Sequence, residues 1–437
     1  MKHFFYTISE SINKKIFKST SILLFTNVVV GIAALLTISI IAKNLTIEEF
    51  GSLAIIQAYA MTINGLFNFQ TWQTVVKYYP DTDNDTILLC SLLKYSFIID
   101  IVTAITSFLF AGFGIFFIAE LIQLKTEYIH PALMYVLIIL FTIEGTATGY
   151  LRIIDKFYCF FITDGITTVA KLITIFYVSK YYGTIESFVL TFVIFAFIKT
   201  LLINIFFVKY IGWSLVRKTC LASINDIKQK FQDIWEFSLY TSLTGSFDIV
   251  FKQADTLVVS TFFGVYYAGI YKMLKTFGNL LLQCINPIYL SLFPVVSERK
   301  HQTKELFSFI NKSIGYLFCL GIIGTCIFYW VHTFFINILF GTDYLEYAPY
   351  LMLYIVPIII SGIFTAVHSS FNLLGFHKTT LYLIVTTSIF YILMIYILKD
   401  YMGFISVLFM LIVHSLIIVS FKYTKLFIFC RNLHAYH

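Results

Sequence analysis

Charged residues are scarce in this chain. Only 12% of its 437 residues are Asp, Glu, Lys or Arg, whereas 59% are hydrophobic, and the mean hydropathy is +0.86. A soluble domain is usually about a quarter charged, so the polar surface is too small to cover a water-soluble globule of this length. The composition therefore excludes a soluble enzyme or nucleic-acid-binding domain, and it indicates that lipid is most of the solvent.

Motifs of enzyme chemistry are also missing. The seven cysteines contain no CxxC pair and fall mostly in apolar runs, so we interpret them as small buried residues. The chain has no Walker loop, no GxSxG or HExxH motif and no His/Cys cluster with metal-ligand spacing. We therefore expect a protein that is not an enzyme, holds no metal or cofactor and does not hydrolyse ATP.

Long apolar runs are abundant instead. Barrel strands would appear as alternating segments of about ten residues, whereas these runs are continuous and about 18 to 28 residues long, as spanning helices require. They predict an all-α integral membrane protein with about twelve transmembrane helices. The predicted spans are Thr20–Ala42, Phe50–Gln70, Ser91–Phe117, Pro131–Tyr150, Tyr158–Val178, Ser187–Val208, Trp235–Phe262, Tyr267–Val295, Ile310–Val331, Ala348–Phe371, Thr380–Leu398 and Gly403–Phe421.

The basic residues predict the orientation of these spans. With the amino terminus in the cytoplasm, 21 of the 30 Lys and Arg residues, Lys422 among them, fall in cytoplasmic segments. Four lie on the other face and five within apolar runs. Because cytoplasmic loops are enriched in Lys and Arg, both termini are predicted to be cytoplasmic, and the net charge of +7 reflects orientation rather than nucleic-acid binding.

Two similar halves are indicated by an internal repeat. A shift of 218 residues places Ala42–Ala54 over Ser260–Lys272, so that Gly51 meets Gly269. With six spans in each half, the repeats are parallel and related by an axis along the membrane normal. We predict an N-terminal six-helix bundle over residues 1–208, a cytoplasmic linker with an amphipathic helix over 209–233, and a C-terminal six-helix bundle over 234–437.

Three stretches resemble a known family. They are "IIAKNLTIEEFGSLAIIQ", "YLRIIDKF" and "DTLVVSTFFGVYYAGIYKML", and they are similar to the first loop, the fourth-to-fifth loop and the seventh and eighth spans of Wzx-type polysaccharide flippases. These proteins belong to the multidrug/oligosaccharidyl-lipid/polysaccharide exporter superfamily. The resemblance implies two six-helix bundles around a central cleft. One departure is that Lys252 and Asp255 stand where many relatives carry arginine.

The resemblance also implies a function. A relative of this kind flips an undecaprenyl-diphosphate-linked oligosaccharide from the inner to the outer leaflet of the bacterial cytoplasmic (inner) membrane by alternating access, for O-antigen or other surface polysaccharide assembly. Its partners would be that lipid-linked oligosaccharide, the bilayer, and a polysaccharide polymerase and chain-length regulator, with no nucleic acid. Coupling to H⁺ or Na⁺ is an open alternative to downhill flux.

Two other functions stay open at this point. One is a cation-coupled multidrug or small-molecule exporter of the same superfamily. The other is a membrane glycan polymerase or ligase. A polymerase would be expected to carry a large arginine-rich outer loop, whereas the longest predicted outer segment, Val331–Tyr347, contains no Lys or Arg. The sequence therefore favours a transporter.

Charged side chains inside the spans are the candidate site residues, because each costs about 2.5–3.5 kcal/mol at mid-membrane on insertion scales. In the seventh span Asp248, Lys252 and Asp255 share one helical face with Thr241 and Thr244. This stripe would line a polar cleft and contact the substrate. The alternative is a self-neutralising ladder that only lets the helix insert.

The remaining candidates fall into three groups. Lysines are candidates for contacting the anionic diphosphate, although those of the eighth span could simply snorkel: Lys171, Lys199, Lys252, Lys272 and Lys275. Acids and one histidine are candidates for binding a coupling cation or lining the cleft, a satisfied interior histidine being the alternative: Asp100, Glu144, Asp164, Asp248, Asp255 and His368. Polar cleft lining, or interhelical hydrogen bonding, is predicted for Gln57, Asn64, Asn68, Thr241, Thr244 and Asn372.

Overall fold

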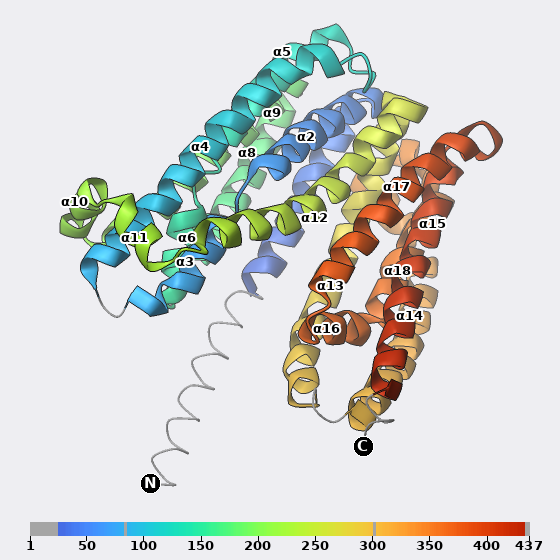
Figure 1. The fold of residues 1–437 in the computed structure, drawn as a ribbon. Helices are drawn as coiled ribbons and strands as arrows, with labels where there is room; N and C mark the ends of the chain where they lie inside the picture. Colours follow the sequence, from blue (N-terminus) through green and yellow to red (C-terminus); the bar gives the residue numbers. More distant parts are fainter. Residues whose placement is uncertain (1–24, 83–84, 300–302, 433–437) are drawn as a thin grey trace. The chain divides into compact units, whose positions relative to one another are not determined.

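The computed structural model describes residues 25–82, 85–299 and 303–432, and across these ranges it is helical without a β-strand (Figure 1). The helix Phe25–Asn44 comes first. The following α-helices are α2 (Ile47–Phe67), α3 (Thr71–Tyr78), α4 (Thr86–Ile118), α5 (Ile129–Leu140), α6 (Gly145–Ile153), α7 (Tyr158–Phe160), α8 (Thr167–Tyr181), α9 (Ile185–Ile211), α10 (Trp213–Leu221), α11 (Ile224–Lys230), α12 (Ile234–Phe263), α13 (Val265–Arg299), α14 (Thr303–Phe340), α15 (Ala348–Ile363), α16 (Thr365–Leu373), α17 (His377–Met402) and α18 (Ile405–Asn432).

The predicted all-α membrane fold is confirmed. Within the described ranges, ten helical segments are long and apolar enough to cross a bilayer. The seventh and eighth predicted spans correspond to α12 and α13, which are not among these ten although they have 30 and 35 residues. About 20 residues suffice to span the hydrocarbon core, so α12 and α13 are long enough, and their polar residues lower their apolar character.

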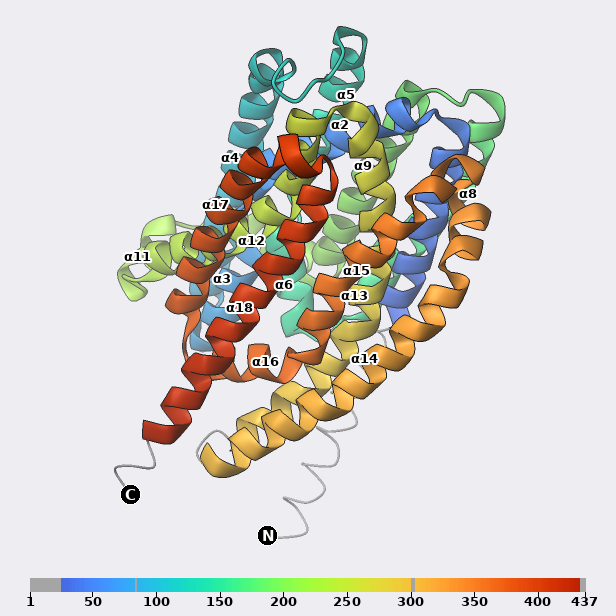
Figure 2. The same ribbon diagram turned by 90° about the vertical axis from the view of Figure 1, so that its right-hand side faces the viewer.

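The chain packs as two compact units. Unit 1 comprises Met1–Thr37 and Ser52–Leu257, and unit 2 comprises Ile38–Gly51 and Val258–His437. The predicted linker, residues 209–233, contains the two short helices α10 and α11, which both pack on α4 within unit 1. In unit 2, α18 packs on α15 and α17, and α13 packs on α15 and α16 (Figure 2).

One span in each unit has the same interrupted form. In unit 1 a 3₁₀ turn, Thr126–Tyr128, leads into α5, which stops and resumes as the short helix α6. In unit 2 a 3₁₀ turn, Thr342–Tyr347, leads into α15, which stops and resumes as the short helix α16. These are the fourth and tenth predicted spans. The matching interruptions agree with the repeat indicated by the sequence.

The start of α2 explains the polar break between the first two spans. Thr46 and Glu49 form reciprocal hydrogen bonds, with the Thr46 amide donating to Glu49 Oε2 at 2.9 Å and the Glu49 amide donating to Thr46 Oγ1 at 3.3 Å. This is a capping box, in which two otherwise unpaired amides at a helix start are satisfied. Thr46 and Glu49 therefore stabilise the start of the second span together.

Gly51 and Gly269, the two residues matched by the repeat, pack against each other's helices in unit 2. A Cβ on Gly51 would lie 2.0 Å from the carbonyl oxygen of Val265, and a Cβ on Gly269 would lie 2.4 Å from that of Ile47. Small residues allow helix backbones to approach this closely. Glycine is therefore required at both positions because the atoms in the way belong to the backbone.

We predict that Gly51→Val destabilises the protein by about 1–3 kcal/mol or more, as overpacking of a close contact does. The measurement is the thermal unfolding midpoint of the purified protein in detergent. Gly112→Ala is the matched control, because a Cβ at Gly112 would have no atom within 4 Å. Equal midpoints for the Gly51 variant and the control would contradict the close contact.

Candidate functional site

Three irregularities of the backbone come together in unit 1. The first separates α2 from α3, where Gln70 has a left-handed backbone with φ of 44°. The second separates α5 from α6 at residues 141–144, and the third is the π-helical segment Phe161–Ile166. Non-helical backbone at membrane depth needs protein partners for its polar groups, and π-helical segments occur frequently at functional sites. The side chains that satisfy these breaks define the candidate site.

Asp100 on α4 holds the beginnings of two helices. Its side chain is buried, and it accepts hydrogen bonds from the hydroxyl of Thr71 and from the amide and hydroxyl of Thr146, the last two at 2.9 and 2.8 Å. Thr71 opens α3, and Thr146 lies in the first turn of α6. A carboxylate suits this place because helix N-termini carry partial positive charge.

Gly145 makes this arrangement possible. A Cβ at this position would lie 2.2 Å from Thr71 Oγ1 and 2.9 Å from Asp100 Oδ1. Any side chain there would push Asp100 away from the two helix starts. The glycine therefore serves the close approach of α3, α4 and α6 at one point.

Side chains of α9 satisfy the carbonyl groups freed by the break between α5 and α6. The Thr200 hydroxyl donates to the carbonyl of Phe141, and the Asn204 side-chain amide donates to that of Ile143 at 3.0 Å. Each unsatisfied backbone group in hydrocarbon costs several kcal/mol. The break is thus fixed from α4 on one side and from α9 on the other.

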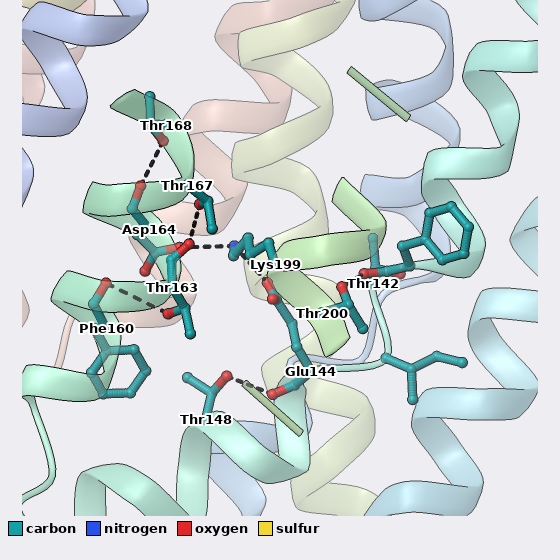
Figure 3. A network of polar contacts seen from close by, with 12 residues as sticks. Thr142, Glu144, Thr148, Phe160, Thr163, Asp164, Thr167, Thr168, Lys199 and Thr200 are labelled. Atoms are coloured by element: carbon teal, nitrogen blue, oxygen red, sulfur yellow. Dashed lines mark hydrogen bonds and ion pairs between the residues drawn. The ribbon is translucent and has the colours of Figure 1, made fainter. Parts of the chain in front are cut away.

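Lys199 joins the second and third irregularities (Figure 3). Its Nζ lies 3.0 Å from Glu144 Oε1 in the α5–α6 break and 3.1 Å from Asp164 Oδ1 in the π-helical segment. Lys199 lies near the middle of α9 (Ile185–Ile211), and each of the three side chains is about one third exposed, at 36%, 30% and 34%. One cation therefore neutralises two carboxylates in part, and none of the three side chains is fully buried. We call Lys199, Glu144 and Asp164 the ionic cluster.

Two other cationic side chains of unit 1 lie over aromatic rings. The guanidinium of Arg152 lies 4.4 Å from the ring centroid of Trp72, and the ammonium of Lys171 lies 5.4 Å from that of Phe192. A cation over an aromatic face is attracted by the ring quadrupole. Unit 1 thus places three cationic groups, Lys171, Lys199 and Arg152, in a region that also contains Asp100 and the ionic cluster acids.

The remaining predicted site residues are placed as follows. Gln57 is buried, whereas Asn64, Asn68 and Thr241 are partly buried in unit 1, and Asn68 Oδ1 accepts from the Gln70 amide. On α12, Lys252 is exposed, and Asp255 accepts from the Thr256 amide at 2.7 Å. Lys272 and Lys275 are partly buried on α13 in unit 2. The side chains of Thr244, Asp248 and Asn372 lie outside the described part of the structure, so the seventh-span stripe stays a prediction.

His368 in unit 2 lies beside a buried lysine of α18. The Nζ of Lys422 is 3.4 Å from His368 Nδ1, and Lys422 is only 5% exposed. The last predicted span ended at Phe421, whereas α18 continues to Asn432, so Lys422 lies within the helix. The helix thus extends a further three turns and buries its first basic residue.

Sequence reasoning missed the helix breaks and their partners, Thr71, Thr146, Arg152, Thr200 and Asn204. The available signal was the polar stretch "TIEGTATG" (residues 142–149) inside the fourth apolar run. A cluster of Thr, Glu and Gly is unusual at membrane depth, where polar residues indicate function or buried packing. Its partners on α4 and α9 are distant in sequence, and only the fold brings them together.

Solved structures with the same fold are transporters and a flippase. A multidrug resistance MATE family transporter of the MOP superfamily, in its inward-facing conformation, aligns with a TM-score of 0.72 at 11% identity, over 92% of this chain and 98% of that one. The lipid II flippase MurJ, in an inward closed conformation, aligns with a TM-score of 0.67 at 17% identity, over 94% of this chain and 87% of that one. At such low identity the likeness shows the fold.

The fold and its spans define the class: this is a multi-pass membrane protein with the fold seen in the MATE family transporter and in MurJ. More narrowly, the family described as "Polysaccharide biosynthesis protein" matches residues 16–300, and the chain belongs to that family. A curated relative, the inner membrane protein YghQ of Escherichia coli (strain K12), is 31% identical over 160 residues, which are 36% of this chain and 44% of that protein. The chain thus matches less than half the length of this relative.

We predict that Asp100→Ala lowers stability by about 1–3 kcal/mol for each buried donor that it leaves unpaired. Asp100→Asn keeps one acceptor oxygen and should lose less. The measurement is thermal unfolding in detergent, with Thr106→Val on the same helix as control, because the Thr106 hydroxyl bonds only to the carbonyl of Val102 among its described contacts. Unchanged stability of the alanine variant would show that Asp100 does not hold α3 and α6.

Proposed function

We propose that this protein flips an undecaprenyl-diphosphate-linked oligosaccharide repeat unit from the inner to the outer leaflet of a bacterial inner membrane. The product would serve O-antigen or other surface polysaccharide assembly. The observation that carries the proposal is the ionic cluster at mid-span, in a chain whose family belongs to polysaccharide biosynthesis. A lysine held at membrane depth by two partly exposed carboxylate side chains would exchange them for another anion.

The diphosphate is the part of the substrate that needs such a cation. Its charge must cross a medium of low dielectric, where a point charge such as an ammonium group acts strongly. Lys199 would leave Glu144 and Asp164 when the diphosphate arrives. The hydroxyls of the sugar chain would bond to polar side chains of the path, and the polyprenyl tail would stay in lipid.

The exchange also suggests how a cation could be coupled. When Lys199 binds phosphate, Glu144 and Asp164 lose their counter-charge, and uptake of H⁺ or Na⁺ would neutralise them. Release of the substrate would restore the ion pairs and expel the cation. Alternating access would then carry the cluster from one side of the membrane to the other, with both termini in the cytoplasm, and a polymerase and a chain-length regulator would consume the product.

Export of drugs or other small molecules by the same fold is the alternative that the resemblance to the MATE family transporter keeps open. A membrane glycan polymerase or ligase is the third candidate function. Drug efflux would depend on a cation gradient in vesicles and leave surface polysaccharide unchanged. A polymerase defect would shorten glycan chains while translocation continued.

We predict that deletion of the gene abolishes the surface polysaccharide and leaves the lipid-linked repeat unit in the inner leaflet. The measurements are surface glycan on gels and accessibility of the lipid-linked sugar to a glycosidase or lectin added outside spheroplasts. Normal delivery to the outer leaflet in a strain without a second flippase would overturn the proposal.

We predict that Lys199→Gln reduces translocation about tenfold or more, as the loss of a charge-assisted hydrogen bond of about 1.5–3 kcal/mol implies. Lys180→Gln is the matched control, since Lys180 is exposed at the end of α8. The triple variant Glu144→Gln, Asp164→Asn, Lys199→Gln contains no unpaired charge and should regain stability but not translocation. Normal translocation by the triple variant would show that the ionic cluster is only structural.

A further inference from the structure

A groove in unit 1 lies apart from the ionic cluster. It has a volume of about 420 Å³ and is lined by α4, by the end of α2 and the following connection, by α11 and by the start of α12. Phe69 and Trp235 form one wall as a stacked pair, with ring centroids 5.9 Å apart. The groove opens on the face of α4 where Ile98 and Val102 are 38% and 55% exposed.

The lining is apolar in spite of its two threonines. Thr103 Oγ1 donates to the carbonyl of Ile99 at 2.8 Å, and Thr106 Oγ1 donates to that of Val102 at 2.7 Å. Both hydroxyls are thus bound to their own helix, as is common for threonine within helices. Hydrocarbon can contact these two side chains without leaving a hydroxyl unpaired. Water in this groove would therefore find few hydrogen-bond partners, whereas a hydrocarbon chain would bury apolar surface there.

One end of the groove is charged. Lys228 is the single charged residue among the described residues that line it. The α10–α11 segment is held at the Tyr95 end of the groove, because Lys94 donates to the carbonyls of Cys220 and Ala222, both at 2.8 Å. The opposite end, at Thr106, lies near the middle of α4 (Thr86–Ile118). A ligand with an anionic head and an apolar tail matches this polarity.

The length of the groove matches the hydrocarbon thickness of one leaflet of a bilayer. Along α4 from Tyr95 to Thr106 it extends about 16 Å at the α-helical rise, and half of a hydrocarbon core of about 30 Å is about 15 Å. A chain that enters beside Lys228 would therefore span one leaflet. The neighbouring helices α10 and α11 expose Trp213, Leu221 and Lys230, a combination typical of segments at the membrane interface.

We propose that this groove binds an anionic phospholipid of one leaflet, with one acyl chain along α4 and the phosphate on Lys228. The lipid would fix α11 and the start of α12 against α4. Basic residues at the membrane interface attract anionic headgroups, and the apolar groove supplies the specificity for a lipid over a free phosphate. This site does not depend on the proposed flippase function, because it lies at the surface of unit 1 and not at the ionic cluster.

The test uses the fluorescence of Trp235 in the full-length chain with Trp72, Trp213 and Trp330 replaced by Phe. The protein is reconstituted into phosphatidylcholine vesicles that contain, at equal low mole fraction, either phosphatidylglycerol or phosphatidylcholine brominated on the acyl chain. We expect several-fold stronger quenching by the brominated phosphatidylglycerol. Thr103→Phe, which fills the groove, should reduce quenching by both lipids.

Lys228→Gln should remove the preference for phosphatidylglycerol, whereas the control Lys230→Gln, at an exposed lysine of the same helix, should keep it. Equal quenching by the two lipids in the unaltered groove would overturn the proposal, as would a preference that persists in Lys228→Gln. Quenching that Thr103→Phe leaves unchanged would show that Trp235 faces only bulk lipid. A preference for phosphatidylglycerol that emerges only after residues 1–24 are removed would show that the chain's own amino-terminal segment occupies the groove. This outcome would also overturn the proposal.

Discussion

The need to satisfy backbone polar groups at membrane depth governs the structure of unit 1. Two spans are interrupted there. The carboxylate of Asp100 accepts hydrogen bonds from the first turns of both short helices that follow, α3 and α6. Without this acceptor, the freed amide of Thr146 would cost several kcal/mol in hydrocarbon. Because α9 satisfies the carbonyl side of the same break, the irregular backbone is fixed from both sides, and the ionic cluster rests on this arrangement.

The internal repeat gives this arrangement a counterpart. Both units contain a span that begins with a 3₁₀ turn and is interrupted before a short helix. The side chains around the two interruptions differ. Unit 1 has carboxylates around Lys199, whereas in unit 2 the buried Lys422 lies beside His368 on α16. The two units thus share the backbone interruption, whereas the charged side chains described around it in unit 1 are not repeated in the same form in unit 2.

Unit 1 also separates two kinds of surface. The ionic cluster places charge at mid-span, where it can exchange partners, whereas the groove along α4 is apolar except for Lys228 at one end. Threonine serves both environments. Thr200 on α9 donates to a backbone carbonyl in the α5–α6 break, whereas Thr103 and Thr106 on α4 bond to their own helix and leave an apolar lining. The backbone that surrounds each threonine decides its role.

The sequence by itself determined the all-α membrane class, because apolar runs of spanning length and scarce charge leave no other solution. It also indicated the repeat, through Gly51 and Gly269, and it identified Lys199, Glu144 and Asp164 as unusual charges. Only the tertiary structure decided that these three meet, that Asp100 binds Thr71 and Thr146, and that Lys422 is buried. These contacts join residues 29 to 55 positions apart, and helical periodicity specifies neighbours only three or four positions apart. Partners on different helices depend on how the helices pack.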